Sequence, residues 1–203
     1  FIGTDVTGTV DLGNDHGVVI GDGAVNNLIG GPEPGARNII SGNNLSGVGT
    51  CCGATGNVVQ GNFIGTDVTG SAPLGNSEHG VFLDTSNNTV GGVAAGAGNV
   101  ISGNGLVGVI INTGTAGNVV QGNFIGTDVT GTLDVGNTFS GMGIADASGN
   151  LVGGTVPGAR NVISGNDGDG ISIGGSASMG NAIEGNFIGT NVTGTLDLGN
   201  GAA

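Results

Sequence analysis

Short apolar segments separated by polar turns run through the whole chain. Each segment holds four or five residues, apolar side chains alternate within it with small or polar ones, and Gly, Asn or Ser follows it. Alternation at a period of two over such short stretches is typical of β-strands, and each apolar run ends before it could form an amphipathic helix. The pattern therefore predicts an all-β chain of many short strands.

The segments recur in a fixed order. A stretch that begins FIGT starts at Phe1, Phe63, Phe124 and Phe187, so successive copies are 62, 61 and 63 residues apart. Each unit divides into two coils, and a coil contains the motifs GVxI, NxVxG and NxIxG or close variants of them. Recurrence of like elements at a short, fixed period is the signature of a solenoid.

The alternation also predicts which side chains point inward, in three columns. The first column is expected to hold Val18 and Ile20, Val81 and Leu83, Val109 and Ile111, Met142 and Ile144, and Ile171 and Ile173. The second is expected to hold Ile29, Val59, Val90, Val120, Val152 and Ile183, and the third Ile40, Ile64, Ile101, Ile125, Ile163 and Ile188.

Asparagine begins two of the three motifs in every coil, and we expect these residues to form amide ladders along the turns. One ladder is expected at Asn27, Asn57, Asn88, Asn118, Asn150 and Asn181, and the other at Asn38, Asn62, Asn99, Asn123, Asn161 and Asn186. The predicted fold is a right-handed parallel β-helix with three short strands per coil, about six to seven coils, and two coils per 61-residue repeat. We expect residues 1–203 to form a single solenoid and to be a segment of a longer array, because the chain starts and stops within a repeat.

Charge narrows the possible partners. The chain has 15 acidic residues against two arginines, Arg37 and Arg160, and no lysine. Because binding to nucleic acids and to anionic membrane surfaces depends on Lys and Arg, neither partner is expected. No apolar run approaches the ~20 residues that a membrane span needs, so membrane insertion is not expected either.

In the order of these motifs the chain resembles the right-handed parallel β-helix repeat proteins of the pectin-lyase-like superfamily. The likeness covers essentially the whole chain, and it is greatest to long, repetitive bacterial proteins that are secreted or displayed at the cell surface. The resemblance implies the fold and an extracellular or cell-surface location. It says little about activity, because the fold hosts lyases, hydrolases, adhesins, phage spikes and stalks.

The residues do not favour an enzyme. The resemblance implies that a lyase would use Arg or Lys as its base, and here both arginines lie in the turn sequence PGARN. The closest pair of carboxylates, Asp167 and Asp169, lies within one turn, and the chain has no Trp or Tyr on which a sugar ring could stack. We therefore expect a non-enzymatic chain. A carbohydrate-active or carbohydrate-binding protein whose active part lies outside this segment, with a polysaccharide as partner, is the alternative.

The loop TDVTGTLDLGN and its variants contain most of the repeated acid. Carboxylates such as Asp5 and Asp11, or Asp128 and Asp134, are oxygen ligands of the kind that Ca²⁺ binds in flexible loops. Copy two has Pro73 in place of the second aspartate, however, and Asp-x-Thr also forms turns that bond their own backbone. Turn formation is the favoured interpretation. No cofactor is predicted, and calcium remains an alternative.

Outward positions on the third face are unusually apolar, and they form a row of Phe63, Val100, Phe124, Val162 and Phe187. Either the apolar residues of the long loops fold back over this row, or the row is an assembly face for another chain. Threonines repeat in the same loops, so an ice-binding solenoid is a further alternative.

Two smaller features complete the candidate chemistry. His16 and His79 occupy matching positions two coils apart, too far to share a metal, and are interpreted as turn residues. Cys51 and Cys52 are adjacent in a turn, for which we favour a structural role over a redox or metal-binding one. Together the sequence favours an extracellular structural module of a β-helical stalk, fibre or adhesin. Its expected partners are further copies of itself, end to end or side by side, or flanking repeats.

Overall fold

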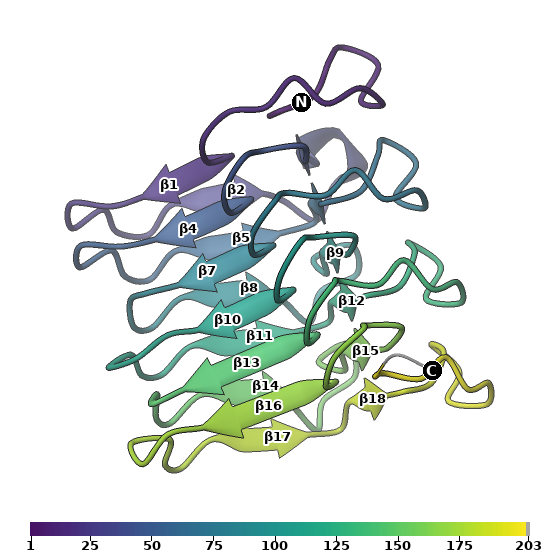
Figure 1. The fold of residues 1–203 in the computed structure, drawn as a ribbon. Helices are drawn as coiled ribbons and strands as arrows, with labels where there is room; N and C mark the ends of the chain where they lie inside the picture. Colours follow the sequence, from purple (N-terminus) through teal and green to yellow (C-terminus); the bar gives the residue numbers. More distant parts are fainter. Residues whose placement is uncertain (202–203) are drawn as a thin grey trace.

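The computed structural model describes residues 1–201 as a rod of stacked coils (Figure 1). Three sheets of six short strands run along the rod, and every strand pair within them is parallel. Each coil contributes one strand to each sheet, so strands three apart in the chain are neighbours. The predicted parallel β-helix with three strands per coil is confirmed.

The strands of each sheet follow one another in chain order. The first sheet contains β1 (Val18–Ile20), β4 (Val48–Thr50), β7 (Val81–Leu83), β10 (Val109–Ile111), β13 (Met142–Ala145) and β16 (Ile171–Gly174). The second contains β2 (Leu28–Gly30), β5 (Val58–Gln60), β8 (Thr89–Gly91), β11 (Val119–Gln121), β14 (Leu151–Gly153) and β17 (Ala182–Glu184). The third contains β3 (Ile39–Ile40), β6 (Phe63–Ile64), β9 (Val100–Ile101), β12 (Phe124–Ile125), β15 (Val162–Ile163) and β18 (Phe187–Ile188).

One short 3₁₀ turn, Pro34–Ala36, interrupts the strands of the described chain. In residues 1–201 no helix has the length and apolar character needed to cross a membrane.

The register places like residues on like. Ile40 pairs with Ile64, and Ile64 with Ile101, and all three side chains are fully buried. The predicted inward columns fill the interior in the middle coils, where burying each aliphatic side chain contributes roughly 1.5–3 kcal/mol. At the last coil the columns open to solvent, and Ile173 and Ile188 are 47% and 46% exposed.

One inward-facing strand position is polar. Thr50 lies between Ile20 and Leu83 in the first sheet and is buried. Its hydroxyl accepts hydrogen bonds from the Thr85 hydroxyl at 2.8 Å and the Asp84 N–H at 3.2 Å. These bonds supply the partners that a buried hydroxyl requires, so the column tolerates a threonine at this coil.

Asparagine ladders stabilise all three corners of the coil. In each ladder the Oδ1 of one Asn accepts a bond from the backbone N–H of the Asn in the preceding coil, as between Asn62 and Asn99 at 3.0 Å. In most steps the same Oδ1 also accepts from Nδ2 of that preceding Asn, at 3.2 Å in this pair. The two ladders expected at Asn27 and at Asn38 are present.

A third ladder was not predicted. It lies at the corner after the third sheet and consists of Asn14, Asn43, Asn76, Asn104, Asn137, Asn166 and Asn200. Three parallel ladders therefore hold each coil to the next by side-chain bonds, in addition to the backbone bonds of the sheets.

Candidate functional site

The corner after the third sheet is the most variable part of the coil. In alternate coils the chain leaves the rod in a long loop at residues 3–14, 65–76, 126–137 and 189–200, and in Figure 1 these loops project from one side. The coils between them turn through a short Ser-Gly-Asn corner at residues 41–43, 102–104 and 164–166. The candidate calcium ligands and the candidate assembly row both lie at this corner, so it is the candidate functional site.

Each long loop is a small hairpin closed by hydrogen bonds to one side chain. The carboxylate of Asp128 accepts bonds from the Thr130 hydroxyl at 2.7 Å and from the N–H groups of Thr132 and Leu133, both at 2.9 Å. Asn191 accepts the equivalent bonds in the last loop, from Thr193, Thr195 and Leu196. An uncharged amide thus accepts the same hydrogen bonds as the carboxylate. This equivalence supports turn formation as the role of the repeated aspartate.

These bonds favour the ionised carboxylate. Hydrogen bonds from Thr7 and from the Thr9 and Val10 N–H groups lower the pKa of Asp5. Burial raises the pKa of Asp128, but the bonds from Leu133, Thr130 and Thr132 outweigh it, and the net pKa is below the ordinary value. Asp67 has the same balance, with burial opposed by Thr69 and Ala72. The hydrogen bonds of the loops therefore stabilise these negative charges.

The second aspartate of each candidate calcium pair lies at the base of the loop. Asp134 Oδ1 accepts a bond from the Gly136 N–H at 2.9 Å, and Asp11 lies against Gly42 of the next coil. The first aspartate accepts bonds from the tip of the loop and the second lies at its base, so the two members of a pair have separate surroundings. Residues 1–201 contain no group of three or more acidic, His or Cys side chains positioned to bind a metal.

The loops fold back over the apolar row and over one another. Phe63 is 3% exposed and packs with Ile39, Val100, Phe124 and Val129. Successive loops join through single backbone bonds. The N–H groups of Val68, Val129 and Val192 donate to the carbonyls of Gly8, Gly70 and Gly131, at 3.1, 2.9 and 2.9 Å respectively.

The row predicted as a possible assembly face is covered in this way. Val100 and Val162 are 2% and 3% exposed, Phe63 is similarly covered, and Phe124 and Phe187 are half-buried. Of the two outcomes that the sequence allowed, the chain adopts the one in which its own loops cover the row.

The two arginines complete this cover. The guanidinium of Arg37 lies 4.0 Å from the ring centroid of Phe63, and that of Arg160 lies 4.0 Å from the ring of Phe187. Their Nε atoms donate to the backbone carbonyls of Gly61 and Gly185. Cation–π contact and carbonyl bonding hold both cations on the rod, as a structural role for the PGARN turns predicts.

His79 and the cysteines lie elsewhere and have local partners. The ring of His79 stacks on Phe82 at 5.7 Å and accepts a bond from the Val107 N–H, and burial lowers its pKa. Cys51 and Cys52 are free thiols. A hydrogen bond that the Cys51 thiol donates to Cys52, together with burial, raises the pKa of Cys51 to about 11, so this thiol stays protonated and poorly nucleophilic at neutral pH.

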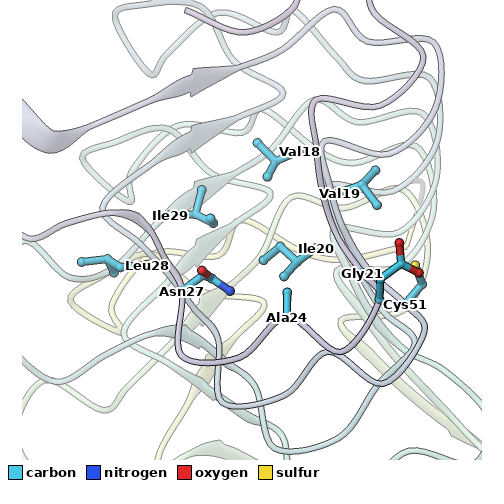
Figure 2. A pocket seen from close by; sticks show the side chains of 10 residues that line it. Val18, Val19, Ile20, Gly21, Ala24, Asn27, Leu28, Ile29 and Cys51 are labelled. Atoms are coloured by element: carbon cyan, nitrogen blue, oxygen red, sulfur yellow. The ribbon is translucent and has the colours of Figure 1, made fainter.

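One hollow of about 610 Å³ opens at the N-terminal edge of the rod. Figure 2 shows Val18, Ile20 and Ile29 turned toward the same space, while Val19 and Leu28 point away. These three residues are the first members of two inward columns, and β1 and β2 are the outermost strands of their sheets. The hollow is therefore the open end of the apolar interior.

Comparison with known proteins does not extend these observations. No protein family, curated protein or solved structure matches the chain at a significant level.

Proposed function

We propose that this chain is a non-enzymatic structural module of an extracellular or cell-surface β-helix, such as a stalk, a fibre or an adhesin. The resemblance to repetitive bacterial proteins of the pectin-lyase-like superfamily supports the location. Its partners would be coils of the same repeat, in the same chain or in a neighbouring one. Nucleic acid and membrane insertion play no part in this proposal.

One observation carries the proposal: the repeated polar side chains, namely the ladder asparagines, the loop aspartates and the two arginines, are engaged between or within coils. Asparagines bond the next coil in three ladders, the loop aspartates bond their own hairpins, and both arginines lie on phenylalanine rings. Such bonds repeat along the described rod instead of converging on a cleft. Repetition of one set of contacts suits a chain whose task is to extend a rigid rod.

The test combines location and activity. Antibodies against the purified chain are expected to label intact, unpermeabilised cells of the source organism, and labelling only after permeabilisation would overturn the proposal. The purified chain is also incubated with acidic and neutral polysaccharides, and new reducing ends and unsaturated products are measured. No turnover is expected, and cleavage of any of them would favour the carbohydrate-active alternative.

The calcium alternative has a separate test. Thermal unfolding is measured after exhaustive treatment with EDTA and again with millimolar Ca²⁺ restored. Because the loop carboxylates already accept hydrogen bonds from their own hairpins, we expect the same midpoint in both conditions. A midpoint that rises with Ca²⁺ would show a structural ion, since a ligand that binds only the folded state stabilises it.

A further inference from the structure

The residue after the core isoleucine of the third sheet alternates between Gly and Ser along the rod. The column contains Gly3, Ser41, Gly65, Ser102, Gly126, Ser164 and Gly189, with Gly in every loop coil and Ser in every short corner. This alternation means that the rod has two kinds of coil in strict succession, and the contacts between them differ on the two sides of each coil.

Each short corner binds the loop coil that follows it. Ser41 Oγ donates to the Thr66 carbonyl at 2.7 Å and accepts from the Gly65 N–H at 3.1 Å. Ser102 Oγ makes the same pair of bonds with the Thr127 carbonyl and the Gly126 N–H, at 2.7 and 3.0 Å. Both serines are fully buried, so these bonds are sheltered from water.

Each short corner also receives the base of the loop that precedes it. A Cβ atom on Gly42 would lie 2.7 Å from Asp11 Oδ1, and one on Gly165 would lie 2.6 Å from Asp134 Oδ1. At Gly103 the same atom would lie 3.0 Å from the Pro73 side chain. The space outside a short corner is already filled by the neighbouring loop, and even a methyl group does not fit there.

The loops themselves meet across the short coil that separates them. The bond from the Val129 N–H to the Gly70 carbonyl joins loops two coils apart, and Val192 and Gly131 repeat it. One loop thus takes up the outer space of two coils. Two loop coils in direct succession would place two hairpins where the structure has room for one.

We propose that the C-terminal edge, formed by β16, β17 and β18, is a docking surface for one kind of occupant: a coil of this repeat with the short Ser-Gly-Asn corner. The edge does not accept a coil that carries a loop. The inference rests on the proposed structural role, which requires coils to dock on one another.

The rest of the edge is complementary to such an occupant. Asn150, Asn161 and Asn166 donate to the three edge asparagines Asn181, Asn186 and Asn200. The edge asparagines would donate in the same way to the Oδ1 atoms of the next coil. An incoming coil would also bury Ile173 and Ile188, which are about half exposed. These contacts are common to both kinds of coil. The two kinds differ at the third corner and at the corner before the third sheet, where only short-corner coils carry a turn such as residues 92–98.

The experiment adds one natural coil to the chain after Asn200. The first extended chain receives residues 77–104, which end in a short corner, and the second receives residues 105–137, which end in a loop. Each segment follows an asparagine of the same ladder, Asn76 or Asn104, so the spacing at the junction is unchanged. Hydrogen exchange of β16–β18 and the thermal midpoint are measured against the unextended chain.

We expect the short-corner extension to slow exchange in β16–β18 at least about tenfold and to raise the midpoint by a few degrees or more. The loop extension is expected to change neither the hydrogen exchange of β16–β18 nor the thermal midpoint. In a third chain, residues 126–137 of the added loop coil are replaced by Ser-Gly-Asn, which should restore the protection and so exclude a general failure of that segment to fold.

The docking rule would be overturned if both extensions protected β16–β18 equally, if only the loop extension did, or if neither did. Failure of the third chain to regain protection would also overturn it. None of these results bears on the proposed extracellular structural role, which the labelling and activity measurements decide separately.

Discussion

Asn99 shows what one ladder residue contributes. Its Oδ1 accepts two bonds from Asn62, and its Nδ2 donates to the Val59 carbonyl at 2.8 Å and to Asn123 Oδ1 at 2.9 Å. The side chain is fully buried. Because the amide carries an acceptor and two donors on one short side chain, it can bond both neighbouring coils at once. An aspartate would lack the donors.

Replacing this residue should therefore be costly. In Asn99→Ala the backbone N–H of Asn62 loses its acceptor and the Val59 carbonyl loses a donor, at about 1–3 kcal/mol for each buried group left unpaired. We expect the free energy of unfolding in urea to fall by at least about 3 kcal/mol. The matched control is Asn44→Ala at an exposed corner position, which should stay within about 0.5 kcal/mol of the parent chain. Equal effects would contradict the ladder's contribution.

At Asp128 the shape of the side chain should matter more than its charge. Asp128→Asn retains an oxygen for the Thr132 and Leu133 N–H groups, as Asn191 does in the last loop, and should cost less than about 1 kcal/mol at pH 7. Asp128→Ala removes the acceptor and should cost about 1–3 kcal/mol. Urea unfolding compares the two, and an Asn variant as unstable as the Ala variant would show that charge is essential.

The lowered pKa of Asp128 predicts that the free energy of unfolding depends on pH. Asp128 has a lowered pKa in the folded chain, so it binds fewer protons there than in the unfolded chain. The stability it contributes is present above the unfolded value of about 3.9 and is lost as the pH falls through the lower, folded pKa. Unfolding free energy measured from pH 5 to pH 2 should fall less steeply in Asp128→Asn than in the parent. Parallel curves would contradict the assignment.

At the scale of strands and corners, the sequence predicts the regular elements well. Alternation at period two assigns Ile64 and Ile101 to the interior, and the register confirms it. The ladder through Asn14, Asn43 and Asn76 escapes the same reasoning, because its members follow the core isoleucine at different distances in loop coils and in short corners. Only the folded corner brings them into one column.

The covering of the phenylalanine row could not be predicted for a related reason. The sequence shows apolar residues in the row and in the loops, but contact between them depends on bonds from one loop to the next, such as Val68 to Gly8. These bonds join residues about sixty positions apart and leave no periodic signal within a single loop. The repeat length is their only trace in the sequence.

The corner glycines allow a matched test of close approach between coils. Gly65 and Gly23 have similar positive φ angles, +88° and +73°. A Cβ on Gly65 would collide with the Ser102 carbonyl and Asn104 Oδ1, whereas one on Gly23 would have no neighbour within 4 Å. Gly23→Ala should cost only the left-handed penalty of about 1–2 kcal/mol, and Gly65→Ala clearly more. Similar midpoints in urea would mean that the neighbouring coil yields.

For the whole molecule, the contacts predict a gradient of stability along the rod. Side chains in the middle, such as Val109, Val120 and Ile125, are fully buried, while Ile173 and Ile188 at the last coil are about half exposed. In a solenoid each coil is stabilised only by its neighbours, so the end coils should open first. We expect amide exchange in β10, β11 and β12 to be at least about a hundredfold slower than in β16, β17 and β18. Uniform exchange would indicate a single cooperative unit instead.

The short sequence separation of ladder partners also affects how the chain can fold during translation. Ladder partners lie 24 residues apart between Asn38 and Asn62 and 38 apart between Asn123 and Asn161. A coil emerging from the ribosome therefore needs only the coil synthesised just before it as a template, and the entropy of closing it depends on that short separation rather than on total length. Each completed coil leaves asparagine N–H donors facing the chain still to come, so folding can proceed in the direction of translation, one coil at a time.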